Sequence, residues 1–252
     1  LEGETLPVRA LRLNGLAGDD SKPILQAKGI FVGTAADWQT LSDRYAGNPL
    51  ALKIVASTIQ DLFDGDISEF LTQGAVVFDD IRNLLDQQFD RLSRLEKDMM
   101  YWLAIARESV TFTELQDDLI AAPKSKLMEA VSSLMHRSLI EKTAQRYTQQ
   151  PVVMEYATER LIETVKGEIE VEIDPKAADS SNLLHSHALL KASEKDYIRD
   201  RQTRLILEPL IEQLLTQFGS KLAIEQRLSL YLEHLRGIRL PGYAGGNLLN
   251  LL

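Results

Sequence analysis

The sequence predicts a mainly α-helical protein. Apolar residues recur at helical spacing along most of its 252 residues, and alternating stretches typical of strands are few and short. The helical pattern dominates between Asp37 and Asp90 and returns between Leu183 and Arg236. Because a helix has to bury its apolar face, these stripes predict helical cores. The stripes of the first stretch are formed by Ala51, Leu52, Val55, Ile59 and Leu62, and by Ile81, Leu84, Leu85 and Phe89.

The composition is that of an ordinary globular protein with room for two or three compact units, at 44% hydrophobic and 26% charged residues. A formal net charge of -9 argues against broad, non-specific binding of polyanions. The absence of cysteine excludes disulfides and thiolate metal sites, and it fits a reducing, cytoplasmic location. No signal peptide or membrane-spanning run is present in the sequence, so we expect no membrane partner.

The first segment carries the clearest strand pattern. Residues Val8 to Leu13 alternate apolar with charged or small residues and close on the turn pair Asn14-Gly15. A short helix from about Ser21 to Lys28 follows, and Gly29 ends it. The stretch from Val8 is therefore predicted to be a single strand, with its sheet partners outside this segment.

A second helix, from about Ala36 to Ala46, leads into a sharp corner. Gly47 stands where a helix C-terminus favours a residue that tolerates positive φ. Asn48 precedes proline and is driven towards extended geometry, and Pro49 suits the first turn of the next helix. The pattern predicts a rigid corner with a proline ring at a helix start. Such a ring can cover the apolar face of a ligand, or it can simply separate two packed helices.

Residues from about Leu92 to Thr164 have the element order of a winged-helix unit. Leu95, Met99, Trp102 and Leu103 indicate a first helix, and Thr113-Glu114-Leu115-Gln116 resembles a capping box that opens a second. A third helix, striped by Leu127, Ala130, Val131 and Leu134, takes the place of a recognition helix. Two hairpin strands, Leu139 to Lys142 and Tyr147 to Gln149, precede a final helix from Val152 to about Val165.

The remainder is predicted to be a linker followed by helices. Gly167 to Ser181 is charged and poor in large apolar groups, which is typical of a linker. Helical spacing then returns, and Pro209 should kink a helix or restart it. Pro241 to Gly246 reads as a loop, and the leucines after it suggest the entry to a further domain. The chain starts without methionine and stops on a leucine-rich end, so we expect it to be a piece of a larger protein.

The corner also carries a family resemblance. Gly47-Asn48-Pro49-Leu50-Ala51-Leu52 resembles the "GxP" motif of NB-ARC ATPases, a class of STAND signal-transduction ATPases. The similarity continues through Asp61 to Asp66 and Leu84 to Leu92, where the residues are similar to those of cyanobacterial members with repeat domains. In this family the proline lies against the adenine of a bound nucleotide. The resemblance therefore implies that Gly47, Asn48, Pro49 and Leu50 contribute to an ADP or ATP site.

The resemblance implies a second nucleotide contact at Gln150. Many relatives carry a Met-His-Asp triplet before the last winged-helix helix, and its histidine reaches the β-phosphate of ADP. The same place here reads Gln149-Gln150-Pro151. A glutamine amide can donate a hydrogen bond to phosphate, but it carries no charge. Because charge-assisted bonds are the stronger ones, this contact should be weaker here or be built elsewhere.

The resemblance also implies a domain order and a role. The expected domains are residues 1–32, the end of a nucleotide-binding α/β domain; 33–90, a helical domain with the motif; 91–166, a winged helix; 167–182, a linker; 183–240, a helical connector; and 241–252, the start of a repeat domain. A phosphate-binding G-x-x-x-x-G-K-[ST] loop is absent from the sequence, so these residues alone should not hydrolyse ATP. We expect no catalytic residues, with magnesium and phosphate held upstream, and oligomerisation on activation.

Two other functions stay open at this stage. A winged-helix transcription regulator could contact DNA phosphates through a locally basic strip. That strip comprises Lys124, Lys126, His136, Arg137, Lys142 and Arg146. The acidic surroundings and the single copy argue against DNA as a partner. A purely structural helical adaptor is the second alternative. The pair His185 and His187 would need further ligands to hold a metal, so no metal site is expected.

Overall fold

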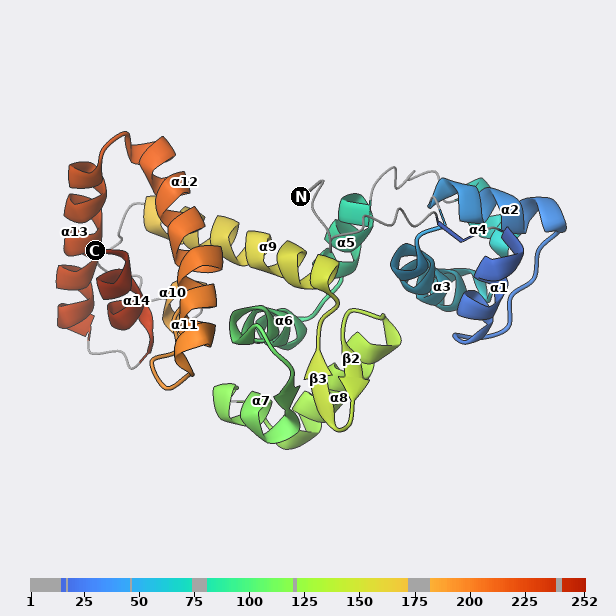
Figure 1. Cartoon of the computed structure of the whole chain (residues 1–252), viewed down its shortest axis with the longest axis horizontal. Coiled ribbons are helices and arrows are strands. Elements are labelled where there is room, and N and C mark those ends of the chain that lie inside the picture. Colours follow the sequence, from blue (N-terminus) through green and yellow to red (C-terminus); the bar gives the residue numbers. More distant parts are fainter. Residues whose placement is uncertain are drawn as a thin grey trace, which may run out of the picture. The chain divides into compact units, whose positions relative to one another are not determined.

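A computed structural model of the chain describes residues 15–16, 18–45, 47–73, 81–119, 122–171, 182–238 and 242–252. Within these ranges the chain is mainly helical and carries one small sheet of short strands (Figure 1). The prediction of a mainly α-helical protein is confirmed. The chain divides into two compact units, Leu1–Arg91 with His136–Ser138 and Leu92–Met135 with Leu139–Leu252. None of the described helices is long and apolar enough to cross a membrane.

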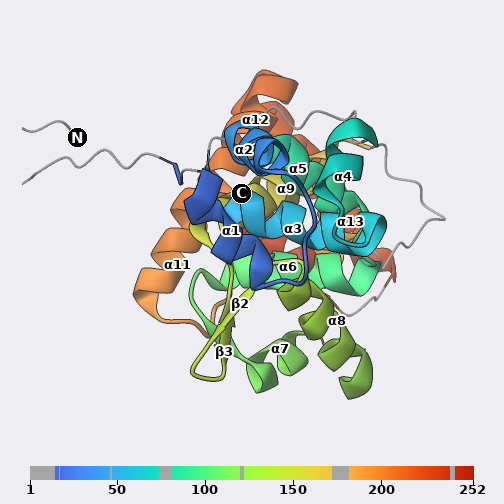
Figure 2. The same ribbon diagram turned by 90° about the vertical axis from the view of Figure 1, so that its right-hand side faces the viewer.

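The first unit is built around α3. Its described helices are α1 (Gly18–Gln26), α2 (Ala35–Arg44), α3 (Pro49–Phe63), α4 (Ile67–Gln73) and α5 (Ile81–Asp90). Helices α1, α4 and α5 all contact α3, and Figure 2 shows α1 lying beside it. Along α3, Leu52, Ile54, Val55, Ala56 and Ile59 are completely buried. The predicted apolar stripe of α3 is thus the core of this unit.

Two details of the first unit differ from the prediction. Leu62 was expected in the core, but its side chain is 57% exposed. It lies in the last turn of α3, where the neighbouring Phe63 makes an edge contact with Phe70 of α4, with ring centroids 5.6 Å apart. Helix α1 begins at Gly18 and includes Pro23, so it starts earlier than the predicted Ser21. The predicted strand from Val8 to Leu13 lies outside the described residues.

The second unit begins with α6 (Arg94–Ala106), β1 (Val110–Thr111), α7 (Phe112–Asp118), α8 (Lys124–His136), β2 (Glu141–Thr143), β3 (Arg146–Thr148) and α9 (Pro151–Glu170). The sheet is antiparallel in the order β1-β3-β2, and Tyr147 pairs with both Val110 and Lys142. The predicted hairpin is therefore present, at Glu141–Thr143 and Arg146–Thr148. Strand β1 was not predicted, because two residues are too few to show an alternating pattern.

The capping box of α7 also lies elsewhere than predicted. Thr111, and not Thr113, is the N-cap: its hydroxyl accepts from the N–H of Glu114 at 3.2 Å. The Glu114 carboxylate in turn accepts from the N–H of Thr111 at 2.6 Å. The reciprocal arrangement requires a Glu three residues after the cap, and that spacing relates Thr111 to Glu114. One residue, Thr111, thus ends β1 and starts α7.

Helix α9 overruns the predicted linker. It continues through Gly167 to Glu170 because Ile162, Val165 and Ile169 extend its buried stripe. Near its end, Arg227 of α13 (Lys221–Ile238) donates to the carbonyl of Ile169 at 2.8 Å. The first four residues of the predicted linker are therefore helical and packed. Its later part, residues 172–181, lies outside the described residues.

The C-terminal helices are α10 (Leu183–Ser186), α11 (Asp196–Gln202), the π-helical segment η1 (Thr203–Leu207), α12 (Glu208–Phe218), α13 and α14 (Ala244–Leu251). Pro209 lies in the first turn of α12, directly after η1, so the predicted restart takes the form of a π-helical turn. Helix α14 packs against α10 and α13. Its buried Asn247 accepts from Leu189 N–H and donates to the carbonyls of Leu184 and His187.

Candidate functional site

The corner before α3 has the geometry that the sequence predicted. Gly47 has φ +62°, in the left-handed region that favours glycine. Its N–H donates to the Ser42 carbonyl at 2.8 Å, and its own carbonyl accepts from Leu16 N–H at 2.9 Å. A Cβ at this position would lie 2.2 Å from the Leu16 carbonyl oxygen. The segment at Leu16 therefore approaches so closely that only glycine fits.

Of the other three corner residues, Asn48 and Leu50 have structural roles, and Pro49 presents an exposed ring. Asn48 is the N-cap of α3, and its side-chain oxygen accepts from the N–H groups of Leu50 at 2.9 Å and Ala51 at 3.2 Å. The Leu50 side chain is buried in the core. Pro49 occupies the first position of α3 and is exposed. Asn48 and Pro49 are both exposed, and the Pro49 ring is the apolar group that the corner offers to a ligand.

Gln150 lies in the second unit, as the N-cap of α9. Its backbone is extended, with φ -64° and ψ 150°, and its side chain makes no capping bond. The side-chain amide instead donates to the carboxylate of Glu141 on β2. The neighbouring Gln149 is buried and donates to the Met100 carbonyl at 3.0 Å. A phosphate at Gln150 would therefore have to share its amide with the nearby Glu141 carboxylate.

Part of the predicted basic strip is engaged within the second unit. Lys126 Nζ lies 2.7 Å from the Glu129 carboxylate. Arg146 donates through Nε to the Ser109 carbonyl at 3.0 Å and lies 3.4 Å from Glu114. Both ion pairs join residues of the second unit and are partly solvent-exposed, so neither excludes a contact with a phosphate. They do lower the positive charge that the strip presents.

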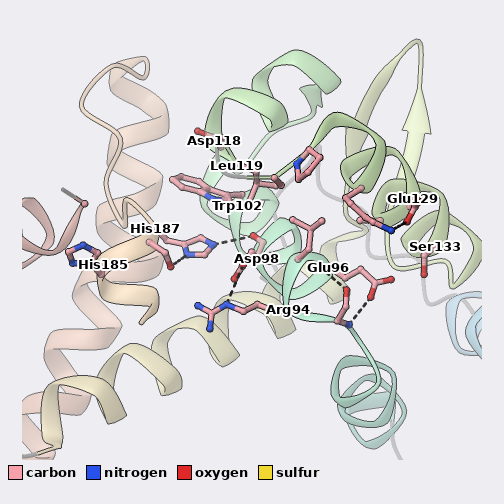
Figure 3. A pocket seen from close by; sticks show the side chains of 18 of the residues that line it. Arg94, Glu96, Asp98, Trp102, Asp118, Leu119, Glu129, Ser133, His185 and His187 are labelled. Atoms are coloured by element: carbon pink, nitrogen blue, oxygen red, sulfur yellow. Dashed lines mark hydrogen bonds and ion pairs between the residues drawn. The ribbon is translucent and has the colours of Figure 1, made fainter. Parts of the chain in front are cut away.

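A cavity in the second unit was not predicted from the sequence. It has a volume of about 1180 Å³ and lies among α6, the end of α7, α8, α10 and the segment at Gly242 and Tyr243 (Figure 3). Apolar lining comes from Leu95, Trp102, Leu119 and Ala130, and charged lining includes Arg94 and Asp98. This volume is slightly above the usual range for small-molecule sites.

Trp102 anchors the wall of the cavity. Its ring stacks on His187 with centroids 4.9 Å apart and meets Tyr243 edge-on at 5.7 Å. Lys191 Nζ lies 5.1 Å from the Trp102 ring centroid and 2.7 Å from Asp118 Oδ1. The indole is only 1% exposed. These contacts fix the wall, so the cavity does not depend on a mobile side chain for its shape.

His187 is a structural histidine of this wall. It is 1% exposed, and burial lowers its pKa to about 4. Nε2 lies 3.1 Å from the Asp98 carbonyl, which can only accept a hydrogen bond. Nε2 therefore carries the proton, and Nδ1 accepts from the Ser186 hydroxyl at 2.8 Å. The imidazole is neutral at pH 7 and holds α10 on the backbone of α6.

The cavity is lined by more acidic than basic side chains. The acids are Glu96, Asp98, Asp118 and Glu129, and the bases are Arg94 and Lys126, which gives a formal lining charge of -2. Desolvation raises the pKa of Asp98, against the opposing effect of Arg94. Desolvation likewise raises the pKa of Asp118, against the hydrogen bond and charge of Lys191. The ion pair of Asp118 is short, whereas Arg94 Nε lies 3.8 Å from Asp98 Oδ2.

Metal chemistry finds no support among the described residues. No group of three or more His, Asp or Glu side chains within the described ranges could hold an ion. His185 and His187 lie close in sequence, but both ring nitrogens of His187 are engaged in hydrogen bonds. No local pattern in the sequence indicates the cavity, because its wall joins residues far apart in the chain.

Comparisons with known proteins give one clear relative in sequence. No family model matches the chain. An uncharacterized WD repeat-containing protein of Nostoc sp. is 49% identical over 284 aligned positions, which cover the whole of this chain and 22% of that protein. The chain thus spans about a fifth of that relative's length. Among solved structures, a STAND protein with a tetratricopeptide repeat sensor from Pyrococcus horikoshii matches with 15% identity and a TM-score of 0.43, over 95% of this chain and 35% of that one.

Proposed function

We propose that the chain is the regulatory part of a STAND-type signal-transduction ATPase of the NB-ARC class. The observation that carries the proposal is the exposed Pro49 ring on a corner fixed by Gly47 and Asn48. A proline ring offers a flat apolar face, which suits the apolar face of an adenine. The resemblance of residues 47–52 to the motif of that class supplies the identity of the ligand, ADP or ATP.

The remaining domains follow from the same proposal. In this proposal the segment from α6 to α9 is a winged-helix domain, and the C-terminal helices connect it to a repeat domain. The name of the Nostoc relative, a WD repeat-containing protein, supports a downstream repeat domain in the intact protein. The phosphate loop, the magnesium ligand and the hydrolytic machinery belong to an upstream nucleotide-binding domain. Bound magnesium there would offset the phosphate charge.

Regulation would work through two arrangements of the domains. Pro49 contributes to the closed arrangement by covering the adenine of ADP, and exchange for ATP favours an open arrangement that exposes an oligomerising surface. A nucleotide can shift this equilibrium only through contacts that differ between the two states. Pro49 is the contact that these residues best provide. Gln150 contributes less, because Glu141 already engages its amide.

The test uses the full-length protein with its upstream domain. We expect ADP to copurify, as measured by chromatography of the supernatant after heat denaturation. Pro49→Ala should lower the bound fraction, because the flat ring is lost while the alanine preserves the helix start. Pro209→Ala is the matched control, since Pro209 also lies in the first turn of a helix. Absence of nucleotide from the unaltered protein, or equal loss in both variants, would refute the proposal.

A second experiment, on the 252-residue chain, separates the two alternative functions. A DNA-binding regulator predicts salt-dependent binding of duplex DNA by the 252-residue chain, measured by fluorescence anisotropy. A structural adaptor predicts that neither nucleotide nor DNA binds. The ion pairs of Lys126 and Arg146 favour a weak response to DNA, so we expect no saturable binding at physiological salt.

A further inference from the structure

The cavity beside Trp102 has the build of a ligand site. Its wall is fixed by the Trp102–His187 stack and by the two ring hydrogen bonds of His187. Tyr243 extends the same wall: its ring meets Trp102 edge-on, and its N–H donates to the His185 carbonyl at 2.9 Å. Asn247 of α14 bonds the same segment through the carbonyls of Leu184 and His187. A preformed cavity of this kind binds without a large ordering cost.

The chemistry of the lining selects against anions. With four acids and two bases, the lining carries a formal charge of -2, and the ion pair of Asp118 with Lys191 behind the wall brings it to -1. Lys126 is already 2.7 Å from Glu129 at the rim. An anionic ligand would therefore meet a net negative surface, and both bases of the lining already face a carboxylate, Lys126 that of Glu129 and Arg94 that of Asp98. A neutral apolar ligand could bind to the walls, but it would add no charged partner for Asp98, whose distance to Arg94 Nε is 3.8 Å.

Asp98 is the best-placed carboxylate for a cationic group. It lies on α6 on the cavity wall, and Figure 3 shows it between Arg94 and His187. Its side chain is 21% exposed, so a ligand can reach it. The ion pair with Arg94 is loose, at 3.8 Å, and the Arg94 side chain is 58% exposed. Exposed pairs of this kind contribute little, so a competing cation can displace Arg94 at small cost.

We propose that this cavity binds a small organic cation, namely a protonated amine joined to an apolar or aromatic body. The amine pairs with Asp98, and the apolar body packs against Leu119, Ala130 and the exposed part of Tyr243. Tyr243 is 41% exposed, so its ring is accessible to such a body. The site is independent of the nucleotide contact proposed at Pro49, which belongs to the first unit.

The test compares three probes of similar size on the 252-residue chain by isothermal titration calorimetry. They are protonated 2-phenylethylamine, neutral 2-phenylethanol and anionic 3-phenylpropionate. We expect the amine to bind more tightly than either of the others. Equal or tighter binding of the alcohol or the acid would overturn the proposal, and so would a lack of binding by the amine. The indole N–H signal of Trp102 in NMR shows whether the amine binds in this cavity. The chain has two tryptophans, so the signal that remains in Trp38→Phe is that of Trp102.

Three variants sharpen the test. Asp98→Asn, which keeps the shape of the side chain, should weaken amine binding by about fivefold or more, the scale of one modest ion pair. Asp196→Asn, on an exposed residue of α11 outside the cavity lining, is the control and should leave binding unchanged. Arg94→Gln removes the competing cation and should tighten binding. Unchanged affinity in both cavity variants would overturn the assignment to Asp98, and circular dichroism checks that each variant is folded.

Discussion

The corner of the first unit and the cavity of the second are built on different scales. At the corner, Gly47, Asn48 and Pro49 follow one another, and most of their contacts lie within a few residues. The cavity instead joins Trp102 of α6 to His187 and Tyr243, which come from distant parts of the chain. A local site depends on backbone conformation, whereas a distributed site depends on the packing of whole helices. Substitutions should therefore act on the two sites through different physical effects.

The largest effect on the corner is expected from Gly47→Ala. Positive φ disfavours a side chain by about 1–2 kcal/mol, and the 2.2 Å approach to Leu16 adds a clash, so we expect a loss of about 3 kcal/mol. The change in free energy of unfolding can be followed in urea through Trp38 fluorescence, in a Trp102→Phe background. Each unit contains one of the two tryptophans, so the remaining indole is a local probe within the first unit.

Gly219→Ala is the matched control for this prediction. Gly219 also has positive φ, at +76°, but a Cβ there would meet no atom within 4 Å. It should therefore lose only the conformational part, about 1 kcal/mol. Its effect is read from Trp102 fluorescence in a Trp38→Phe background, since Gly219 lies in the second unit. Equal losses at the two glycines would show that the approach of Leu16 contributes nothing to the rigidity of the corner.

The cavity should respond to pH through His187. Burial lowers its pKa to about 4 in the folded state, against about 6.5 in the unfolded chain. Between these values the unfolded chain binds more protons, so the free energy of unfolding rises with pH. Acidification from pH 6.5 to 4 should cost the second unit up to about 3 kcal/mol from this residue. Urea unfolding at a series of pH values, followed through Trp102, measures it.

The control for the pH effect is His187→Gln, which keeps a polar side chain but cannot be protonated. Asp98 and Asp118 have raised pKa values, so they stabilise the folded state on acidification and oppose the histidine. Removing the histidine should therefore flatten the pH dependence or reverse its sign. A profile that is the same in both proteins would mean that His187 is not neutral and buried in solution.

Sequence reasoning reached the corner because short-range rules determine it. Positive φ at a glycine, a pre-proline residue in extended geometry and a proline at a helix start are all local, and the structure has each of them. The same reasoning placed the cap of α7 at Thr113 and missed β1, because Thr111 serves both elements at once. It also ended α9 too early, since charged residues hid the buried Ile169. The cavity could not be predicted from the sequence, because no local rule indicates that Trp102 and His187 pack together.

A third prediction compares the two helices that begin with proline. Asn48 caps α3 through two hydrogen bonds, whereas Gln150 makes no capping bond to α9. Asn48→Ala should therefore cost the first unit about 1 kcal/mol, and Gln150→Ala should cost the second unit only a few tenths. The urea midpoints of the two single-tryptophan proteins give both values. A larger loss at Gln150 would indicate that its bond to Glu141 stabilises the hairpin more than a cap stabilises a helix.

The smallest effect on stability is expected at Pro49, the residue proposed to contact the adenine. Pro49 is exposed, so Pro49→Ala should change the free energy of unfolding by no more than about 0.5 kcal/mol. The loss of the fixed φ slightly favours the unfolded chain, and the high helix propensity of alanine offsets it. If the variant unfolds much more easily, the ring is a structural part of the corner, and any loss of nucleotide would be a consequence of misfolding. A stable variant that no longer retains ADP would separate the two roles, because only an exposed ring that contacts the ligand can affect binding without affecting the fold.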